Sequence, residues 1–244
     1  MRSSTMKVWR SVQAFLASIL MLSFATFPFM ANAAYEDLFA TTKKASWAVY
    51  QRTTNGMSAI CSAGAYKTTD TVTYMVSAGH CFVGQDLNRT DFLVTQDHKS
   101  FVKARVYRSG LTAKKGADET STDLDKFNGN DWAIVEASIG NQGVMPIGDS
   151  DKLVLGEDLV IVGVPFGMDF LAVQGIVGSK DLSLSPTVWN HHMGANVFIA
   201  GGNSGSAVIS VKQRAIVGVI VAGPGPQSSL AIFIPITLVN TEVK

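Results

Sequence analysis

The sequence predicts an all-β protein, an antiparallel sandwich or barrel built from many short strands. Short runs rich in Val, Ile and aromatic residues recur along the chain, separated by clusters of Gly, Ser, Asn, Asp and Pro. This pattern is typical of strands joined by turns. After the first 33 residues, no long segment has the 3.6-residue period of an amphipathic helix. A helical bundle and a βαβ repeat are therefore excluded.

Nine runs are predicted as strands and one stretch as a helical turn. In chain order the runs are residues 47–50, 71–76, 101–107, 132–135, 159–164, 171–177, 207–209, 215–221 and 230–234. Residues 149–153 (Asp-Ser-Asp-Lys-Leu) favour one helical turn. Residues 109–130 are polar and mixed in charge, so we expect an exposed loop there.

The composition is that of a globular protein. Of the 244 residues, 47% are hydrophobic, 16% are charged and two are Cys. These values exclude disorder and a disulfide-rich mini-scaffold. A net charge of +1 lacks the basic excess of nucleic-acid-binding proteins, so we expect no nucleic-acid partner.

Residues 1–33 are predicted to be a signal peptide. Arg2, Lys7 and Arg10 supply a positive start, an apolar run follows, and residues 31–33 (Ala-Asn-Ala) have the small-x-small pattern that a signal peptidase reads. The alternative is an uncleaved membrane anchor, because the uncharged run from Ser11 to Tyr35 is long enough to span a bilayer. Cleavage after residue 33 predicts a secreted or periplasmic mature chain without a stable membrane span.

The chain has two cysteines, Cys61 and Cys81. In an exported protein, one disulfide between them is the simplest interpretation, because the compartment is oxidising. Closing a loop of this size stabilises a fold by about 3 kcal/mol in the chain-entropy model. A pair of free thiols is the alternative.

Three short motifs carry the residue types of serine-based hydrolysis. One predicted strand ends in His80, another opens with Asp131, and a glycine-rich turn holds Ser204. A serine nucleophile needs a base near pH 7, a role that neutral imidazole fills, and the imidazole needs a carboxylate to orient it. The tetrahedral intermediate needs backbone N–H donors, which glycines beside the serine help to present.

The order of these residues along the chain separates the classes of serine hydrolase. An α/β-hydrolase has a Gly-x-Ser-x-Gly elbow with its Asp and His after the serine. Here position 206 is Ser, and no His follows Ser204. A subtilisin-type order needs an Asp before His80, and Asp37 and Asp70 lie in no supporting motif. The order His, Asp, Ser is that of the chymotrypsin-like double barrel.

Four blocks of the sequence resemble trypsin-like serine peptidases. Residues 77–81 (Ser-Ala-Gly-His-Cys), 130–135 (Asn-Asp-Trp-Ala-Ile-Val) and 202–206 (Gly-Asn-Ser-Gly-Ser) are similar to the three signature blocks of that family. A further stretch, with the ending at 233–236 (Phe-Ile-Pro-Ile), is similar to the second barrel of HtrA-type peptidases. It comprises residues 146–153, 156–157, 163–167 (Gly-Val-Pro-Phe-Gly) and 175–177.

The resemblance implies two six-stranded antiparallel β-barrels with the active site in the cleft between them. The first barrel, expected within residues 34–140, would carry His80 and Asp131. The second, expected within residues 141–244, would carry Ser204. Full HtrA peptidases also have a C-terminal PDZ domain, which is not expected in this chain. The oligomeric state stays open.

Further roles follow from the resemblance. The N–H groups of Gly202 and Ser204 would form the oxyanion hole, and a disulfide between Cys61 and Cys81 would match the one that fixes the loop of the catalytic His. No metal and no cofactor is implied. The digestive relatives have an Asp where this chain has Asn203, so we expect no activation by insertion of a new N-terminus.

The resemblance also places the S1 pocket. Its expected lining is Phe198, Ile199, Ala200, Ile220, Val221 and Ala222. None of these residues is acidic, so a buried Arg or Lys at P1 would have no counter-charge. Small or medium apolar P1 residues are expected instead.

The sequence therefore predicts an exported serine endopeptidase that acts on protein or peptide substrates. His80 would serve as general base and acid, Asp131 as the orienting carboxylate and Ser204 as the nucleophile. Two alternatives stay open: a non-catalytic binding protein on the same fold, and an esterase that uses the same triad.

Overall fold

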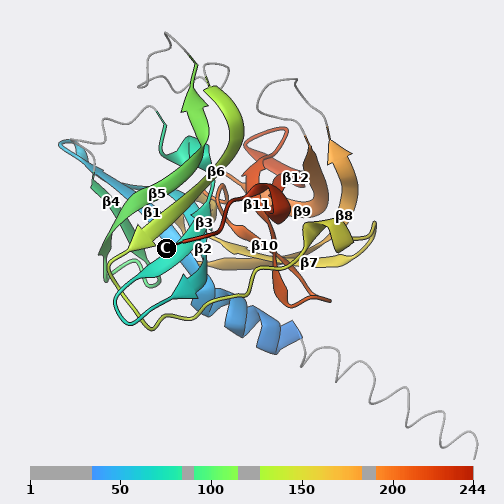
Figure 1. Ribbon diagram of the computed structural model, residues 1–244, viewed down its shortest axis with the longest axis horizontal. Coiled ribbons are helices and arrows are strands. Elements are labelled where there is room, and N and C mark those ends of the chain that lie inside the picture. Colours follow the sequence, from blue (N-terminus) through green and yellow to red (C-terminus); the bar gives the residue numbers. More distant parts are fainter. Residues whose placement is uncertain (1–34, 84–90, 115–126, 183–190, 244) are drawn as a thin grey trace, which may run out of the picture. The chain divides into compact units, whose positions relative to one another are not determined.

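The structure, a computed structural model, describes residues 35–83, 91–114, 127–182 and 191–243. The predicted signal peptide at residues 1–33 lies outside them. The described residues from Phe39 onward hold two closed antiparallel barrels of six strands each (Figure 1). The all-β, double-barrel prediction is confirmed.

The first barrel has the strand order β1-β2-β3-β6-β5-β4. Its strands are β1 (Ser46–Thr53), β2 (Gly56–Thr68), β3 (Thr73–Ser77), β4 (Asp91–Thr95), β5 (Val102–Ala113) and β6 (Phe127–Ala137). β3 and β6 are neighbours although two strands separate them in sequence, and their register ends at the pair Ser77↔Ala133. This pairing brings the end of β3 to the first half of β6.

The second barrel repeats the same plan, with the strand order β10-β11-β12-β9-β8-β7. Its strands are β7 (Asp158–Gly163), β8 (Leu171–Leu182), β9 (His192–Ala200), β10 (Ala207–Ser210), β11 (Ala215–Ala222) and β12 (Gln227–Pro235). Aliphatic side chains from these strands surround the fully buried Phe233 and form the core. Gly218 leaves the room that this ring needs, since a Cβ there would lie 2.3 Å from Phe233 Cδ2.

Each of the nine predicted runs overlaps a strand, and three further strands, β2, β4 and β9, have no predicted counterpart. β2 is the longest strand of the described residues, yet it is rich in Gly, Ala and Ser. Packing requires these small residues, because a Cβ on Gly64 would lie 2.4 Å from Ala207 Cβ of the second barrel. Contact between the barrels therefore overrides strand propensity here.

The prediction of an exposed loop at residues 109–130 is wrong at both ends of this range. β5 continues to Ala113 and β6 begins at Phe127, and these two residues pair. Leu111 of β5 and Phe127 of β6 are both buried and belong to one small hydrophobic cluster. A ribbon with one solvated face has a polar composition that resembles that of a loop, which explains the error. Residues 115–126 lie outside the described residues.

Two helical elements can also be compared with the sequence prediction. The helical turn predicted at residues 149–153 is confirmed as a 3₁₀ turn, η3 (Ser150–Lys152), which Asp149 caps by accepting from the Asp151 N–H at 3.0 Å. An α-helix over residues 35–45, just before β1, has no predicted counterpart. It is too short for its apolar spacing to stand out from the surrounding sequence.

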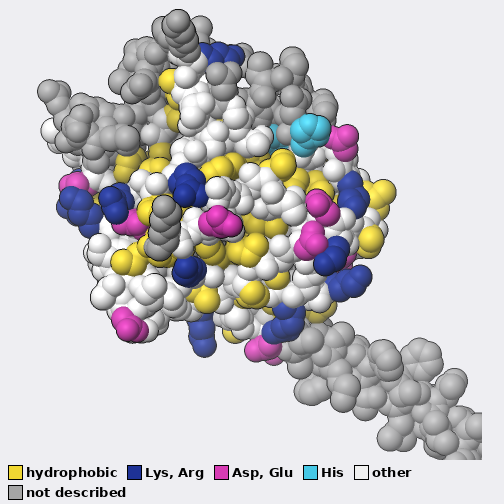
Figure 2. Space-filling view, viewed as in Figure 1, with side chains coloured by type: hydrophobic (Ala, Val, Ile, Leu, Met, Phe, Trp, Pro, Cys, Tyr) yellow, Lys and Arg dark blue, Asp and Glu magenta, His cyan; other side chains and the backbone are white. Residues whose placement is uncertain are grey.

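The surface carries both signs of charge. On the face shown in Figure 2, Lys and Arg side chains alternate with Asp and Glu. Among the described residues, no helix has the length and apolar character needed to cross a membrane.

Candidate active site

The β3–β6 pairing brings His80 and Asp131 together. His80 lies in a 3₁₀ turn, η1 (Gly79–Cys81), directly after β3. Extending the register beyond Ser77↔Ala133 places this turn opposite Asp131. His80 Nδ1 lies 2.7 Å from Asp131 Oδ2, and the backbone N–H of His80 donates to Asp131 Oδ1 at 2.6 Å. The carboxylate therefore holds both the ring and the main chain of the histidine.

Burial strengthens this pair. The Asp131 side chain is 0% exposed and that of His80 is 27% exposed. Burial alone would lower the pKa of His80, but the hydrogen bond and the charge of Asp131 outweigh it and raise the pKa above its usual value. The imidazole is thus prepared to accept a proton and to be stabilised as a cation.

Gly79 allows the close approach of the two loops. A Cβ at this position would lie 3.2 Å from Asp131 Oδ1 and 3.0 Å from the Trp132 carbonyl oxygen. A side chain there would push the η1 turn away from β6. The glycine of the Ser-Ala-Gly-His-Cys block is therefore explained by packing against the carboxylate.

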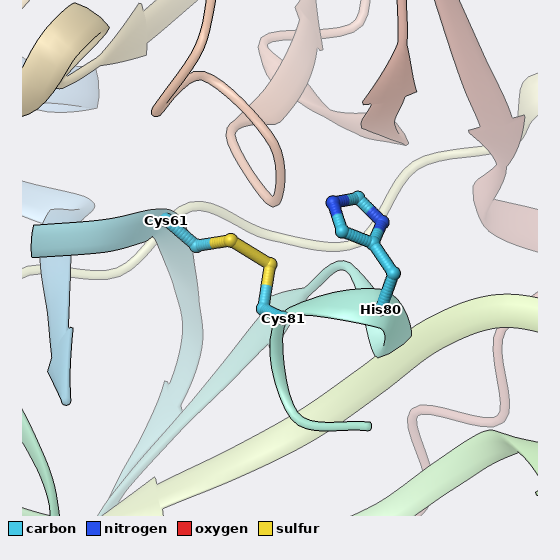
Figure 3. Close-up of side chains that lie close together, drawn as sticks. All are labelled: Cys61, His80 and Cys81. Atoms are coloured by element: carbon cyan, nitrogen blue, oxygen red, sulfur yellow. A yellow bond between two sulfur atoms is a disulfide. The ribbon is translucent and has the colours of Figure 1, made fainter. Parts of the chain in front are cut away.

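The predicted disulfide is present and fixes the other side of the His80 turn. Cys61 of β2 is bonded to Cys81 of η1, whose Cα atoms are 6.3 Å apart. Figure 3 shows the disulfide beside His80, with the imidazole extending from the same turn. The histidine loop is thus attached to β2 by a covalent bond and to β6 by the carboxylate.

The same strands contact the turn that carries Ser204. This turn, residues 201–206, joins β9 to β10, and the Ser62 N–H of β2 donates to the Ser204 carbonyl oxygen at 2.8 Å. Gly205 has φ +86°, and a Cβ there would lie 2.1 Å from the Ser62 carbonyl oxygen and 2.3 Å from Ser77 Oγ. The serine turn therefore packs on β2 and on the end of β3, three residues before His80.

The turn also presents two unpaired N–H groups. Within the described part of the chain, the amides of Gly202 and Ser204 donate no hydrogen bond. Hydrogen bonds around them fix the turn: Asn203 N–H donates to the Ala200 carbonyl at 3.0 Å, and Ser206 N–H donates to the Asn203 carbonyl at 2.9 Å. An arrangement of fixed, free donors beside a serine is suited to an oxyanion.

The six residues expected to line the S1 pocket lie in several environments. Ile199 and Ile220 belong to the core of the second barrel. Ala200 and Val221 are buried, Ala222 is half-buried, and the Phe198 side chain is 44% exposed. The Ile199 side chain also approaches Gly223, where a Cβ would lie 2.8 Å from Ile199 Cδ1. All six side chains are apolar.

One group of potential metal ligands occurs among the described residues. Its members are Cys61, His80 and Cys81, whose ligand atoms lie within 4.8 Å of one another (Figure 3). Both sulfur atoms are bonded to each other, so this group offers no thiolate for a metal.

Two features of the site have no counterpart among the predicted site residues. Ser62 is fully buried and contacts both Gly202 and Ser204. The 3₁₀ turn η4 (Pro165–Gly167) packs on the serine turn, where the Phe166 N–H donates to the Gly201 carbonyl at 2.5 Å. For η4, the HtrA-like block at residues 163–167 is a sequence signal that could have identified it as part of the site. A lone serine within a strand, such as Ser62, gives no such signal.

Family and sequence comparisons both match this chain to serine peptidases. The family described as "Trypsin-like peptidase domain" matches residues 59–219, more than half of the chain. A "Probable periplasmic serine endoprotease DegP-like" of Pseudomonas putida (strain GB-1) is 31% identical over 109 residues, which are 45% of this chain and 21% of the relative. The "Putative serine protease HhoB" of Synechocystis is 28% identical over 153 residues, 59% of this chain and 36% of the relative. The chain thus matches only a minor part of these relatives' length.

Solved structures show the same fold. The structure titled "HtrA-type protease AlgW with tripeptide" superposes with a TM-score of 0.64 at 20% identity, covering 84% of this chain and 60% of that one. The variant "AlgWS227A with decapeptide" gives a TM-score of 0.63 at 16% identity, covering 84% and 64%. At this level of identity the likeness concerns the double-barrel architecture.

Proposed function

The chain belongs to the family of trypsin-like peptidase domains, and from that premise we propose that it is a serine endopeptidase acting on proteins or peptides. The observation that carries the proposal is the buried pair of His80 and Asp131, held at 2.7 Å beside the turn of Ser204. A buried carboxylate that orients a histidine is the arrangement that activates a serine nucleophile.

Each residue of the triad has a defined role in the proposed reaction, and His80 acts first as base and then as acid. His80 takes the proton of Ser204 Oγ as the oxygen attacks the peptide carbonyl, and Asp131 stabilises the imidazolium that forms. The N–H groups of Gly202 and Ser204 bind the negative oxygen of the tetrahedral intermediate. The imidazolium then protonates the leaving amine, and water, activated by His80, hydrolyses the acyl-enzyme.

Small or medium apolar P1 residues are the proposed preference. The support is that residues 198–200 and 220–222 are all apolar and include no acidic side chain. A basic P1 side chain would be desolvated there without a counter-charge, at a cost of several kcal/mol. Matched tetrapeptide amides with Ala, Val or Arg at P1 test this preference through kcat/KM.

Export is proposed as well. The leader pattern at residues 1–33 supports cleavage after residue 33, and the DegP-like relatives are named as periplasmic. The mature chain would then hold its two barrels within residues 34–140 and 141–244. N-terminal sequencing of the protein recovered from the cell exterior or periplasm tests the cleavage site.

Hydrolysis of casein and of a small ester, measured on the folded wild type and on Ser204→Ala, tests the proposed activity. The proposal predicts cleavage of both substrates by the wild type and of neither by the variant. Ester cleavage without proteolysis would favour an esterase. A folded wild type inactive on both substrates would favour a binding protein on the same fold.

A further inference from the structure

Ser62 connects the main segments of the site from a single buried position. It lies in β2 of the first barrel and is 0% exposed. Its N–H donates to the Ser204 carbonyl and its own carbonyl accepts from Ser77 Oγ, both at 2.8 Å. Its hydroxyl makes two more contacts, with Gly202 and Val164. No other polar side chain among the described residues bonds to Gly202.

The direction of the Ser62 hydroxyl is fixed by its partners. Ser62 Oγ donates to the Gly202 carbonyl oxygen at 2.8 Å and accepts from the Val164 N–H at 3.1 Å. An amide N–H can only donate and a carbonyl oxygen can only accept, so the hydroxyl proton has one possible orientation. The Gly202 carbonyl therefore points toward β2.

This hydrogen bond restrains a segment that would otherwise rotate easily. Residues 201 and 202 are both glycine, and Gly202 has φ +96°, so steric barriers to turning the peptide between them are low. The Phe166 N–H holds the Gly201 carbonyl on one side of Gly202. Ser62 holds the Gly202 carbonyl on the other side.

The bond to the Gly201 carbonyl sets the direction of the Gly202 N–H, and the Ser62 bond on the next peptide limits rotation about Gly202. In a trans peptide the N–H is opposite to the preceding carbonyl, and no cis peptide is present among the described residues. With the Gly201 carbonyl bound to the η4 turn, the Gly202 N–H faces away from that turn and stays unpaired. Rotation of the peptide would instead turn a carbonyl oxygen toward the substrate oxygen.

We propose that Ser62 is a positioning residue for the oxyanion hole: its hydroxyl fixes the Gly202–Asn203 peptide through the Gly202 carbonyl, and this limits rotation about Gly202 that would move the Gly202 N–H out of the donor orientation. The inference rests on the proposed serine-peptidase function. Ser62 itself touches neither the substrate nor the reacting atoms, since all of its polar atoms are bonded within the protein.

The inference predicts a selective kinetic defect. A misplaced donor weakens binding of the transition state and leaves ground-state binding unchanged, so kcat falls and KM does not. Misplacement of a positioned group lowers rates by about 10- to 100-fold. Affinity for a peptide aldehyde, which forms a tetrahedral adduct in the oxyanion hole, should fall by a similar factor.

The test compares Ser62→Ala with a matched control, Ser210→Ala. Ser210 is also 0% exposed, and its hydroxyl also donates once, to Glu157 Oε1 at 2.6 Å, and accepts once, from the Gln213 N–H at 3.0 Å. It lies at the end of β10, outside the proposed site. Both variants lose the same group, and the control reports the general effect of losing a buried serine hydroxyl.

We expect Ser62→Ala to lose about 10- to 100-fold in kcat and in aldehyde affinity, with KM within about threefold of the wild type. Ser210→Ala should keep wild-type kcat, KM and aldehyde affinity. Should Ser62→Ala fail to fold, Ser62→Gly removes the same hydroxyl and receives the same measurements. Unchanged kcat and aldehyde affinity, or a rise confined to KM, would overturn the inference.

The experiment separates this inference from the proposed function. If the folded wild type hydrolyses no peptide and binds no aldehyde, the proposed peptidase function fails, and the role of Ser62 fails with it. If the wild type is active and Ser62→Ala behaves as Ser210→Ala, only the positioning role fails.

Discussion

The two barrels contribute to the site by different means. The first barrel supplies ionisable side chains, His80 and Asp131, which are held by side-chain hydrogen bonds and by the adjacent disulfide. The second barrel supplies Ser204 in a glycine-rich turn that is held almost entirely by main-chain hydrogen bonds. One half of the site thus depends on charge and the other on backbone geometry.

This difference indicates which substitutions each half can tolerate. In the first barrel, a change that keeps the shape and removes the charge should be the most damaging. In the second barrel, adding one methyl group to a glycine, with every functional group kept, should be enough to lower activity. The first two substitutions below each alter one of these two properties, and the next two predictions concern the disulfide and the pKa of His80.

The largest effect is expected from Asp131→Asn. The amide keeps the size of the carboxylate but favours the wrong tautomer of His80 and cannot stabilise its cation, so kcat should fall by about 10⁴-fold. Glu157→Gln is the matched control, since Glu157 is 8% exposed and accepts from Ser210 Oγ outside the site. Steady-state kinetics measure both. A loss under about tenfold in Asp131→Asn would refute the dependence on charge.

A smaller loss is expected from Gly202→Ala. The new Cβ would lie 2.4 Å from the Val164 carbonyl oxygen at a φ of +96°, so the turn must move and one oxyanion donor is lost. Removal of one such donor lowers kcat by about 10²- to 10³-fold. Gly156→Ala controls for backbone strain, because Gly156 has φ +79° with nothing within 4 Å, and it should keep wild-type kcat. Equal kcat values in the two variants would contradict the geometric argument.

Removal of the disulfide should mainly affect stability. In Cys61→Ser/Cys81→Ser, a loop with a sequence separation of 20 is opened, which lowers the free energy of unfolding by about 3 kcal/mol. Asp131 still holds the His80 turn in this variant, so kcat should fall less than in Asp131→Asn. Urea denaturation and kinetics on the same preparation measure both quantities. A larger kcat loss than in Asp131→Asn would show that the disulfide, and not the carboxylate, positions the histidine.

The smallest expected effect is a shift of the acid limb in the pH profile of kcat/KM. The base must be neutral to accept a proton, and Asp131 raises the pKa of His80, so activity should rise with pH through an inflection above about 6.5, the ordinary histidine value. The same shift stabilises the fold below the unfolded pKa, and this stabilisation is lost as pH rises through the folded pKa. An inflection below the ordinary value would show that desolvation outweighs the carboxylate.

The sequence predicts the first half of the site better than the second. His80 and Asp131 stand in blocks with recognisable neighbours, and their separation follows once β3 and β6 are paired. The role of Ser62 arises only from folding, because its hydroxyl bonds to the backbone of Gly202 across 140 positions of sequence. The block that forms η4 is recognisable in the sequence, but its contact with Gly201, 35 positions away, is not. Backbone acceptors leave no trace in side-chain patterns.

The errors in the fold have a common cause. β2 is hard to recognise because its small residues serve the contact between the barrels, as at Gly64. The β5–β6 hairpin around Leu111 and Phe127 is hard to recognise because a solvated ribbon is polar. In both cases tertiary surroundings, which a local pattern does not contain, decide the residue type.

The most direct measurement is labelling with a fluorophosphonate probe, read by intact mass and peptide mapping on the wild type, Ser204→Ala and His80→Ala. An activated serine reacts with such a probe and an ordinary buried or surface serine does not. The triad predicts one adduct per chain, located on Ser204, absent from Ser204→Ala and strongly slowed in His80→Ala. A folded wild type that stays unlabelled, or an adduct on another residue, would contradict the assignment of Ser204 as the nucleophile.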